Sequence, residues 1–435
     1  MALITKKVYG TEDILPKDSY KWQFIEDIMK KESELFGFNE IRTPVFEHTE
    51  LFKRGVGDTT DVVQKEMYTF DTKGGTSITL RPEGTAGSAR ALLEHAIYND
   101  GLPVKASYFV SCYRYEKKQA HRYREFHQFG LEVYGTASPV ADAELILACD
   151  SIFKRLQITN LQLEINSIGC PVCRKEYHKK LIEFFNNHTD SLCDTCLSRL
   201  EKNPMRIVDC KSKICSNIAK DAPKTIDNLC DECSTHFEQV KKHLDNLGVD
   251  YIVNPTIVRG LDYYTKTVFE FVTDSLGTQG TVCGGGRYDG LIEQLGGQHM
   301  PSLGFALGME RLLSLMDAQN IEIPQPEPCQ IYIASMGDNA TLKGMQLLKE
   351  LRLSSIKAQS DIIGKSLRAQ MKYADKIGAK YSIVIGDNEI EQNKATLKNM
   401  SNKEQYDITL GENFITEFIQ IDEDNKKKEM FKNFD

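Results

Sequence analysis

Residues 108–135 read YFVSCYRYEKKQAHRYREFHQFGLEVYG, and this stretch decides which fold class the rest of the sequence supports. Aromatic and β-branched residues alternate with polar ones on both sides of a basic loop at residues 117–124. Such alternation is typical of strands, because successive side chains of a strand point to opposite faces. The stretch therefore predicts two strands that are joined by the basic loop and can pair antiparallel.

One face of this predicted hairpin carries polar groups. On the second strand, Gln128 and Glu132 should stand about 13 Å apart, at about 3.3 Å per residue, with Gly130 between them. The first strand would add Arg114 and Glu116 to the same side. We expect this face to form a platform for a small polar ligand, while the opposite face packs in the core. A solvated face of paired charges is the alternative for such a stretch considered alone.

Composition limits the kind of protein. The chain has 435 residues, 41% hydrophobic and 27% charged, which predicts a globular protein of two to four domains. No run approaches the roughly 18 apolar residues of a membrane span. The beginning of the sequence lacks the apolar core of a secretory signal, so we expect a cytoplasmic protein without a membrane partner. The net charge of −8 leaves nucleic-acid binding open, because that needs only a local basic surface.

A second polar site is predicted where a strand gives way to a helix. Residues 77–93, SITLRPEGTAGSARALL, contain the breaker sequence PEGT between a strand pattern and a helical one. Glu83 then lies at the turn, where a side chain can point into a cleft, and Thr85 is expected to cap the helix. The alternative is a solvated Glu83 beside a Thr85 that only caps.

Two glycine-containing segments are expected to allow close approach of a backbone or a ligand. Residues 284–286 are three consecutive glycines, whose spacing fits no phosphate-binding fingerprint. Residues 302–316, SLGFALGMERLLSLM, predict one amphipathic helix with Gly304, Gly308 and Arg311 on a single face. A ligand could approach this face beneath the guanidinium, and close packing against a sheet is the alternative.

Eight of the chain's twelve Cys residues lie between residues 170 and 233. They form four pairs, namely Cys170 and Cys173, Cys193 and Cys196, Cys210 and Cys215, and Cys230 and Cys233. In a cytoplasmic chain such pairs favour thiolate metal sites over disulfides. Eight thiolates could fill two four-sulfur zinc sites. The alternative is a helical insert in which the Cys side chains are small buried hydrophobes.

The motifs resemble those of one enzyme family. YRYE, the basic loop and FHQFGLEVYG are similar to the second signature motif of class II aminoacyl-tRNA synthetases, in the form found in the histidyl-tRNA synthetase family. Residues 258–272, VRGLDYYTKTVFEFV, match a motif peculiar to that family, and residues 302–316 resemble the third class II motif. An amphipathic helix at residues 19–36, followed by a strand with Pro44, resembles the first. The resemblance implies an α+β fold with an antiparallel catalytic sheet.

This resemblance also implies which residues bind the substrates. Arg259 would face the substrate carboxylate and the reacting α-phosphate, and Arg114 would bind the α-phosphate, so these two are the expected catalytic residues. Arg311 would hold the γ-phosphate of ATP, and Glu132 with Tyr264 would bind the imidazole. The residues implied for histidine are Glu83 and Thr85 at the α-amino group, Gln128, Glu132, Arg259, Tyr263, Tyr264 and Tyr288, and those implied for ATP are Arg114, Glu116, Arg122, Phe126 and Arg311.

The implied activity is the ligation of histidine to tRNA. ATP, with bound Mg²⁺, would convert histidine to histidyl-adenylate and pyrophosphate, and the 3′ end of tRNA(His) would then accept the histidyl group. Such chemistry rests on positioning and charge stabilisation, so no Ser, Cys or His nucleophile is expected. The first motif implies a homodimer. Zinc in the Cys-rich part would be structural, because the family's chemistry does not require it.

The order of the motifs predicts the domain organisation. The expected segments are a first catalytic part at residues 1–165, a Cys-rich insertion at 166–245, a second catalytic part at 246–322, a linker at 323–328, an anticodon-binding domain at 329–425 and a charged, frayed tail at 426–435. The anticodon-binding domain rests on a predicted βαβαβ pattern. One of its predicted helices carries a basic stripe suited to phosphates, made by Lys365, Arg368, Lys372 and Lys376.

Two other functions fit part of the pattern. A non-catalytic regulatory subunit of the first enzyme of histidine biosynthesis resembles the catalytic domain but usually lacks the anticodon domain, and the motif arginines present here argue against it. A class II synthetase for proline or threonine is the other, and RGLDYYT with the pair Gln128 and Glu132 argues against that. The basic loop departs from the family at His121, where Gly is common, so its contact with tRNA is an open question.

Overall fold

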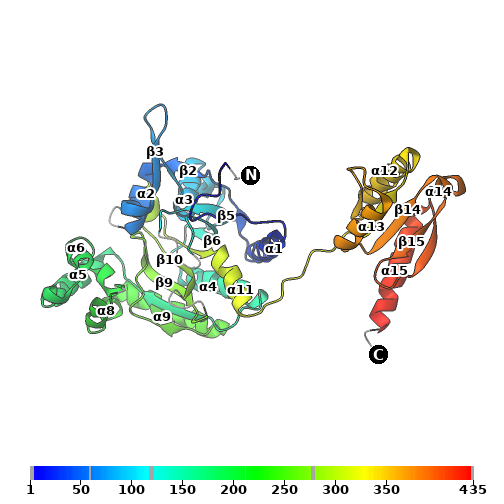
Figure 1. Cartoon of the computed structure of the whole chain (residues 1–435). Helices are drawn as coiled ribbons and strands as arrows, with labels where there is room; N and C mark the ends of the chain where they lie inside the picture. Colours follow the sequence, from blue (N-terminus) through cyan, green and yellow to red (C-terminus); the bar gives the residue numbers. More distant parts are fainter. Residues whose placement is uncertain (1–3, 58–59, 117–121, 211, 276–279, 433–435) are drawn as a thin grey trace. The chain divides into compact units, whose positions relative to one another are not determined.

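The computed structural model describes residues 4–57, 60–116, 122–210, 212–275 and 280–432, with side chains up to residue 428. The part of the basic loop that contains His121 lies outside the described residues. The chain divides into two compact units, Met1–Pro324 and Gln325–Asp435, and Figure 1 shows the elements of each. Among the described residues, no helix is both long and apolar enough to cross a bilayer.

The first unit is built on one eight-stranded sheet with the order β1-β5-β6-β11-β10-β9-β7-β8. Its strands are β1 (Asn39–Glu40), β5 (Val104–Tyr113), β6 (Glu125–Tyr134), β7 (Gln162–Ser167), β8 (Ile252–Val253), β9 (Thr265–Val272), β10 (Thr281–Arg287) and β11 (Ser302–Gly308). The six strands from β5 to β7 pair antiparallel, and only the short edge strands β1 and β8 pair parallel. The predicted antiparallel catalytic sheet is therefore confirmed.

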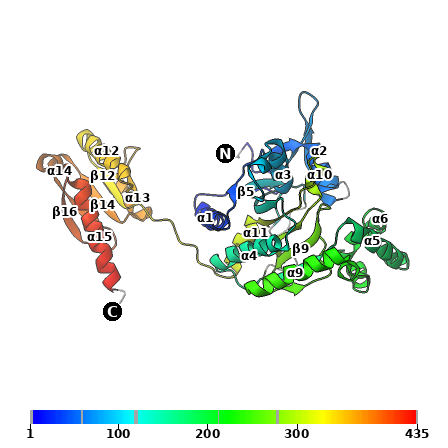
Figure 2. The ribbon, with the colours of Figure 1, turned by 180° about the vertical axis from the view of Figure 1, so that it is seen from behind.

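One face of this sheet is covered by helices. Packed against it are α1 (Ser19–Leu35), α4 (Pro139–Arg155), α9 (Asp231–Leu247) and α11 (Met309–Ala318). Figure 2 shows α4 and α9 along the sheet. Phe129, Leu131 and Val133 of β6 lie in this core, as the predicted alternation requires. The even-numbered residues of β6 therefore face the other way, and they form the floor of the candidate site.

Residues 302–316 do not form the single helix that we predicted. Ser302–Gly308 is strand β11, which pairs with β6 and β10, and the helix begins only at Met309. Leu303, Phe305 and Leu307 are buried at alternate positions, so their period of two was the strand signal. Gly304 is required by this strand, because a Cβ there would collide with the carboxylate of Glu132 on β6.

The first unit also contains a small three-stranded sheet with the order β2-β4-β3. Its strands are β2 (Phe46–His48), β3 (Tyr68–Asp71) and β4 (Ser77–Leu80), and the short elements nearby are α2 (Thr49–Val56), η1 (Val62–Glu66), α3 (Thr85–Glu94), η2 (Ile97–Asp100) and α10 (Leu291–Gln294). Pro44 precedes the edge strand β2, a position that a residue without an N–H tolerates.

The Cys-rich segment is a helical insertion between β7 and β8. It contains α5 (Pro171–Asn186), η3 (Thr189–Ser191), α6 (Asp194–Lys202), α7 (Met205–Val208), α8 (Lys213–Ala219), η4 (Thr225–Asn228) and α9. In the three C-x-x-C pairs, the first Cys is the residue immediately before a helix, namely α5, α6 or α9. The second Cys then lies within the first turn of that helix, so the backbone N–H groups of the turn are close to both sulfurs.

The second unit has a mixed five-stranded sheet with the order β13-β12-β14-β15-β16. Its elements are β12 (Ile331–Ser335), α12 (Asp338–Leu353), β13 (Ala358–Ser360), α13 (Leu367–Lys376), β14 (Tyr381–Ile385), α14 (Asp387–Gln392), β15 (Lys394–Asn399), β16 (Gln405–Thr409) and α15 (Phe414–Lys432). The parallel strands β13, β12 and β14 confirm the predicted βαβαβ pattern. The predicted frayed tail is wrong up to Lys432, because α15, anchored by buried Phe414 and Phe418, continues through it.

Candidate active site

A cleft of about 310 Å³ opens on the polar face of the large sheet. Its charged and amide side chains are Arg114, Arg122, Arg259, Arg311, Glu116, Glu270, Glu310 and Gln128, and Phe126 adds an aromatic ring. All six of the residues expected to bind ATP or the α-phosphate, including Arg259, line this cleft. We refer to it as the arginine cleft.

Arg114 follows the end of β5, Arg122 precedes β6, and hydrogen bonds hold both side chains. Arg114 Nε donates to the carbonyl of Pro82 over 2.9 Å, and its guanidinium lies 5.3 Å from the centre of the Phe126 ring. Arg122 Nη1 donates to Glu116 Oε2 over 2.8 Å. Of the four polar residues predicted to share one face, Arg114, Glu116 and Gln128 line this cleft, and Glu132 does not.

Arg259 reaches the cleft across the glycine run. Its guanidinium lies on Gly284, where a Cβ would collide with it, so the glycine provides the close approach that we expected. Arg259 pairs with the Glu270 carboxylate and lies 5.5 Å from the ring centre of Tyr264. Burial lowers the pKa of the guanidinium, but the charge of Glu270 outweighs it and leaves the pKa raised. Arg259 is therefore a permanent cation in a partly buried place.

Arg311 enters the cleft from the first turn of α11. Its Nη1 donates to the backbone carbonyl of Thr281 on β10. Burial and the nearby charge of Arg122 lower the pKa of Arg311. A guanidinium keeps its charge despite such a shift, and two adjacent cations attract an anion strongly. This end of the cleft is therefore suited to a phosphate.

Glu132 lies apart from the arginine cleft, in a closed cluster. Its carboxylate accepts hydrogen bonds from Thr85 Oγ1 (2.7 Å), Tyr108 OH (2.9 Å) and Tyr288 OH, and its side chain has no exposed surface. Burial raises the pKa of Glu132 to about 8, against the lowering effect of these three hydroxyl donors. We refer to Glu132, Thr85, Tyr108 and Tyr288 as the Glu132 cluster.

Two expectations about this region are wrong. The space above Gly130 is not an open platform, because the Tyr108 ring fills it and a Cβ on Gly130 would collide with that ring. Thr85 does not cap helix α3. The cap is the Glu83 carboxylate, which accepts from the backbone N–H groups of Thr85 and Ala86, both over 2.8 Å. A carboxylate two residues before the helix start reaches these donors, which left the Thr85 hydroxyl available to Glu132.

The expected tyrosines gather beside the Glu132 cluster. The rings of Tyr263 and Tyr264 are 4.7 Å apart, and those of Tyr263 and Tyr288 are 5.5 Å apart. Tyr264 contacts Arg259, so it lies where the cluster meets the arginine cleft. Gln128 lines the cleft, and its Oε1 lies 3.3 Å from the Cys112 sulfur. The structure thus divides the expected residues between two adjoining compartments.

Sequence reasoning missed two acidic residues of the cleft. Glu270 pairs with Arg259 and accepts from Thr281 Oγ1 over 2.9 Å. Glu310 accepts from the backbone N–H of His127 over 2.9 Å, and its carboxylate lies 2.8 Å from that ring's Nδ1. The sequence did contain a weak indication of both residues. Glu270 interrupts the apolar residues that follow the Arg259 motif, and Glu310 directly precedes Arg311.

The eight Cys residues come together as two quartets. The first Cys cluster is Cys170, Cys173, Cys230 and Cys233, and the second is Cys193, Cys196, Cys210 and Cys215; within each quartet the sulfurs all lie within 4.8 Å of one another. Sulfurs are 3.7 Å apart in Cys170 and Cys173 and 4.0 Å apart in Cys193 and Cys210, and all are free thiols. Four sulfurs at about 2.3 Å from a tetrahedral zinc would lie about 3.8 Å apart, so both quartets have suitable dimensions.

Two of these thiols ionise easily. Burial opposes ionisation of Cys170, but hydrogen bonds led by the backbone N–H of Cys173 lower its pKa to about 7. The backbone N–H of Cys196 is the main group that lowers the pKa of Cys193, also to about 7. In both cases the thiol with the lowered pKa belongs to the residue immediately before a helix, where N–H groups and the helix dipole favour a thiolate.

An antiparallel sheet that presents arginines from three motifs to one cleft agrees with the class II aminoacyl-tRNA synthetases that the motifs resemble. A sequence model described as histidyl-tRNA synthetase matches residues 10–171 and 204–312, and one described as anticodon binding domain matches residues 330–420. The chain belongs to the histidyl-tRNA synthetase family.

Individual relatives agree with this assignment. The chain is 53% identical to the histidine–tRNA ligase of Clostridium perfringens over 97% of its own length and 100% of the relative. It is 55% identical to that of Acetivibrio thermocellus, with 94% and 98% covered. The crystal structure of apo histidyl-tRNA synthetase from S. aureus superposes with a TM-score of 0.82 at 40% identity, and covers 95% of this chain and 100% of that one.

Proposed function

We propose that the arginine cleft and the Glu132 cluster together activate histidine with ATP, and that the histidyl group then passes to the 3′ end of tRNA(His). The chain is an ATP-dependent aminoacyl-tRNA ligase, a histidine–tRNA ligase. The observation that carries the assignment of the site is the buried Glu132 carboxylate beside a cleft with four arginines. The first suits an imidazole, and the second suits a triphosphate.

Phosphate binding is the proposed task of the cleft. Arg114 would hold the α-phosphate and Arg311 the γ-phosphate, because their guanidinium groups line the cleft and are oriented by hydrogen bonds to backbone carbonyls. Phe126 would stack on the adenine, and Arg122 with Glu116 would close the entrance. Mg²⁺, when bound, would neutralise phosphate charge during the transfer, and the carboxylates of Glu116, Glu270 and Glu310 are oxygen ligands of the kind it prefers.

Arg259 is the proposed bridge between the two reactants. The histidine carboxylate attacks the α-phosphate, and negative charge on the phosphate oxygens must be stabilised as the bond forms. Arg259 contacts both Glu270 in the cleft and Tyr264 beside the Glu132 cluster. Its planar guanidinium can donate to the carboxylate with one edge and to the phosphate with another. We therefore assign charge stabilisation at the reacting centre to Arg259.

Histidine specificity is assigned to the Glu132 cluster. A carboxylate facing an imidazole N–H distinguishes histidine from apolar amino acids of similar size, because a buried acceptor left without a donor costs free energy. Tyr264 and Tyr288 would complete the pocket around the ring, and Tyr263 would pack against both. Glu83, Thr85 and Gln128 are proposed for the α-amino group.

The second unit is proposed to bind the tRNA anticodon, since it matches an anticodon-binding model. Helix α13 exposes Arg368, Lys372 and Lys376, which are suited to phosphate contacts. Lys365 is less exposed and lies 4.5 Å from the ring centre of Tyr373. We further propose a cytoplasmic homodimer that forms through the region of β2, where the apolar Phe46 is 55% exposed.

One or two structural zinc ions are proposed for the Cys clusters. Each quartet offers four sulfurs at distances that fit one tetrahedral ion. We expect one or two zinc ions per chain by elemental analysis of protein purified without chelator. Chelation should loosen the insertion before the catalytic sheet, because metal binding is coupled to local folding. Protein without metal and with eight freely titrating thiols would reject this proposal.

The proposed function is tested by charging tRNA(His) with labelled histidine. We expect acid-precipitable histidine only when ATP, Mg²⁺ and tRNA(His) are all present. Arg311→Ala serves as the matched variant, because it should raise the ATP concentration needed while leaving the histidine requirement unchanged. Charging that is independent of ATP, or that is equal with a tRNA for another amino acid, would contradict the proposal.

A further inference from the structure

The loop from Arg259 to Tyr264 is contacted by the Cys-rich insertion at both of its ends. Arg206 Nη1 donates to the carbonyl of Arg259 over 2.9 Å, and Arg174 Nη1 donates to the carbonyl of Tyr264 over 3.1 Å. Between them, the side-chain amide of Asn203 donates to the Asp262 carboxylate over 3.1 Å. The insertion thus holds the backbone on both sides of the loop's central residues.

Each of these two arginines is attached to a different Cys cluster. Arg174 follows Cys173 of the first cluster in the sequence, within the first turn of α5. Arg206 lies on α7, between the two Cys pairs of the second cluster, and its side chain is 18% exposed. Helix α6, which begins in the second cluster, supports Arg206 through Arg199, whose Nη1 donates to the Arg206 carbonyl over 3.1 Å. Both arginines therefore lie on segments of the insertion that also carry the Cys residues of a cluster.

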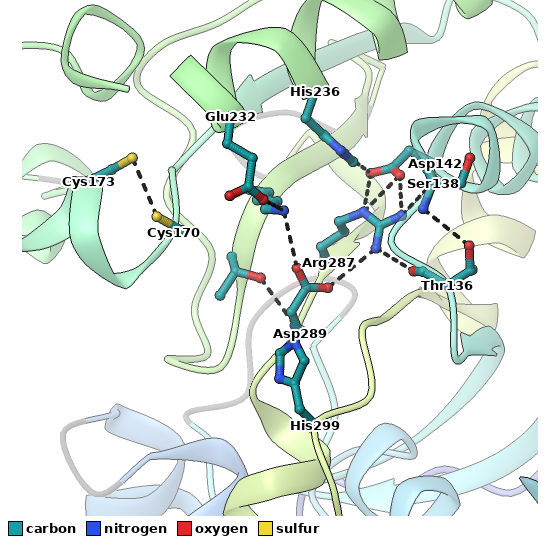
Figure 3. Close-up of polar contacts among 12 residues, drawn as sticks. Thr136, Ser138, Asp142, Cys170, Cys173, Glu232, His236, Arg287, Asp289 and His299 are labelled. Atoms are coloured by element: carbon teal, nitrogen blue, oxygen red, sulfur yellow. Dashed lines mark hydrogen bonds and ion pairs between the residues drawn. The ribbon is translucent and has the colours of Figure 1, made fainter. Parts of the chain in front are cut away.

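Helix α9, which begins at Cys230 of the first Cys cluster, also contacts the sheet, and Figure 3 shows the polar contacts around its residues Glu232 and His236. Glu232, between the two Cys residues that begin this helix, accepts from Lys266 Nζ over 2.8 Å. One turn later His236 lies 3.4 Å from Asp142, which accepts from the fully buried Arg287 over 2.8 Å. Lys266 belongs to the strand after the loop, and Arg287 directly precedes a tyrosine of the Glu132 cluster. Through α9, the first Cys cluster is thus linked to β9, which follows the loop, and to β10, which ends just before Tyr288.

We propose that Arg174 and Arg206 are positioning residues for adenylate formation, and that the metal-loaded Cys clusters fix them so that Arg259 is held over the reacting centre. This inference rests on the proposed function. It adds that metal loading of an insertion outside the cleft sets the rate of the chemical step. The Arg259 backbone has its carbonyl anchored from the insertion, while the same residue's guanidinium lies in the cleft. A loosened anchor therefore displaces the guanidinium directly.

The alternative is an insertion that only stabilises the fold. The two possibilities differ in what the arginine substitutions change. A purely stabilising insertion predicts a lower unfolding temperature with unchanged turnover of the folded enzyme. A positioning role predicts lower turnover in protein that is folded and fully metal-loaded.

We would substitute the anchors singly as Arg206→Met and Arg174→Met in the full chain. Matched controls are Lys202→Met and Lys175→Met, which remove exposed cations near the two anchors: Lys175 follows Arg174 in α5, and Lys202 ends α6, four residues before Arg206. Histidine-dependent ATP–pyrophosphate exchange, zinc content and thermal unfolding are measured for each. We expect each anchor variant to lose about 10- to 100-fold in turnover, since a small displacement of a reacting group has effects of that size. Its apparent KM for ATP and its zinc content should stay unchanged, and the controls should match the unsubstituted chain.

Two further measurements separate positioning from folding. Arg206→Lys retains one donor for the Arg259 carbonyl and should recover part of the lost turnover, which a folding defect would not predict. Hydrogen exchange of the backbone amides at residues 258–264 should become faster in Arg206→Met, with unchanged exchange in β6 and β11. A variant that fails to fold would be replaced by Arg206→Lys alone, whose turnover and loop exchange still decide the question.

The link to metal is tested by combining Arg206→Met with Cys196→Ser. If the second cluster acts through Arg206, the double variant should turn over about as slowly as the slower single variant, because both changes cut the same connection. Multiplied losses, or normal turnover and loop exchange in both anchor variants, would overturn the inference. Even if the inference is overturned, the proposed function stands as long as the unsubstituted chain catalyses histidine-dependent ATP–pyrophosphate exchange. If the unsubstituted chain does not catalyse that reaction, the proposed function itself is rejected.

Discussion

The arginine cleft and the Glu132 cluster lie on the same face of one sheet, yet they treat charge in opposite ways. The cleft collects four guanidinium groups in an open space, and burial does not remove their charge. The Glu132 carboxylate is closed off from solvent, and burial raises its pKa to about 8. The difference supports the proposal that the cleft neutralises a highly charged reactant, while the cluster selects a neutral ring through directed hydrogen bonds.

The largest effect is expected where the two compartments meet. Arg259→Lys keeps a positive charge but loses the planar donor geometry that can span carboxylate and phosphate. We expect histidine-dependent exchange to fall by about 100- to 1,000-fold, which is typical for the loss of one donor to a developing charge. Circular dichroism should show an unchanged fold. Near-normal exchange in Arg259→Lys would remove this residue from the mechanism.

Substitutions in the arginine cleft and in the Glu132 cluster should affect the kinetic constants of different substrates. Glu132→Gln should raise the apparent KM for histidine by roughly 10- to 100-fold, the range expected for the loss of one buried hydrogen bond, with little effect on ATP. Arg311→Ala should do the reverse. Both constants are obtained from exchange assays in which one substrate is varied. A Glu132→Gln enzyme with unchanged affinity and turnover would show that the imidazole does not bind there.

A smaller effect is expected on the pH dependence of stability. The pKa of Glu132 is about 8 in the folded chain and near 4.5 when exposed, so between these values the folded state keeps a proton that the unfolded state has lost. Its contribution to stability is complete below the lower value and falls as pH rises. Between about pH 5.5 and about pH 7 the free energy of unfolding should decrease by about 2 kcal/mol relative to Glu132→Gln. If denaturation shows that the free energy of unfolding changes equally for the two proteins between these pH values, the raised pKa of Glu132 is contradicted.

The sequence predicted the hairpin well but not the contents of its polar face. The alternation in residues 125–134 determined which side chains enter the core, because a strand has a strict period of two. It could not show that Tyr108, from the neighbouring strand, fills the space above Gly130. That contact depends on register, which joins residues 22 positions apart and pairs Tyr108 with Gly130.

The errors elsewhere have a similar origin. At residues 302–316 the apolar spacing allowed a helix, and the pairing of Ser302–Gly308 with two strands decided for a strand. Thr85 is of a residue type that often caps helices, but in the structure the Glu83 carboxylate accepts from the N–H groups at the start of α3. The Cys pairs indicated candidate metal ligands by residue type and spacing, and only the fold showed which pairs combine. Local patterns identified the groups, and long-range packing chose their partners.

The most direct test of this account is ATP–pyrophosphate exchange measured with each of the twenty amino acids in turn. The Glu132 cluster predicts rapid exchange with histidine and at least about 100-fold slower exchange with glutamine, phenylalanine and the other seventeen, a lower limit for a site built to hydrogen-bond its substrate. Exchange of comparable rate with any other amino acid, or none with histidine, would contradict the claim that this buried carboxylate selects the substrate.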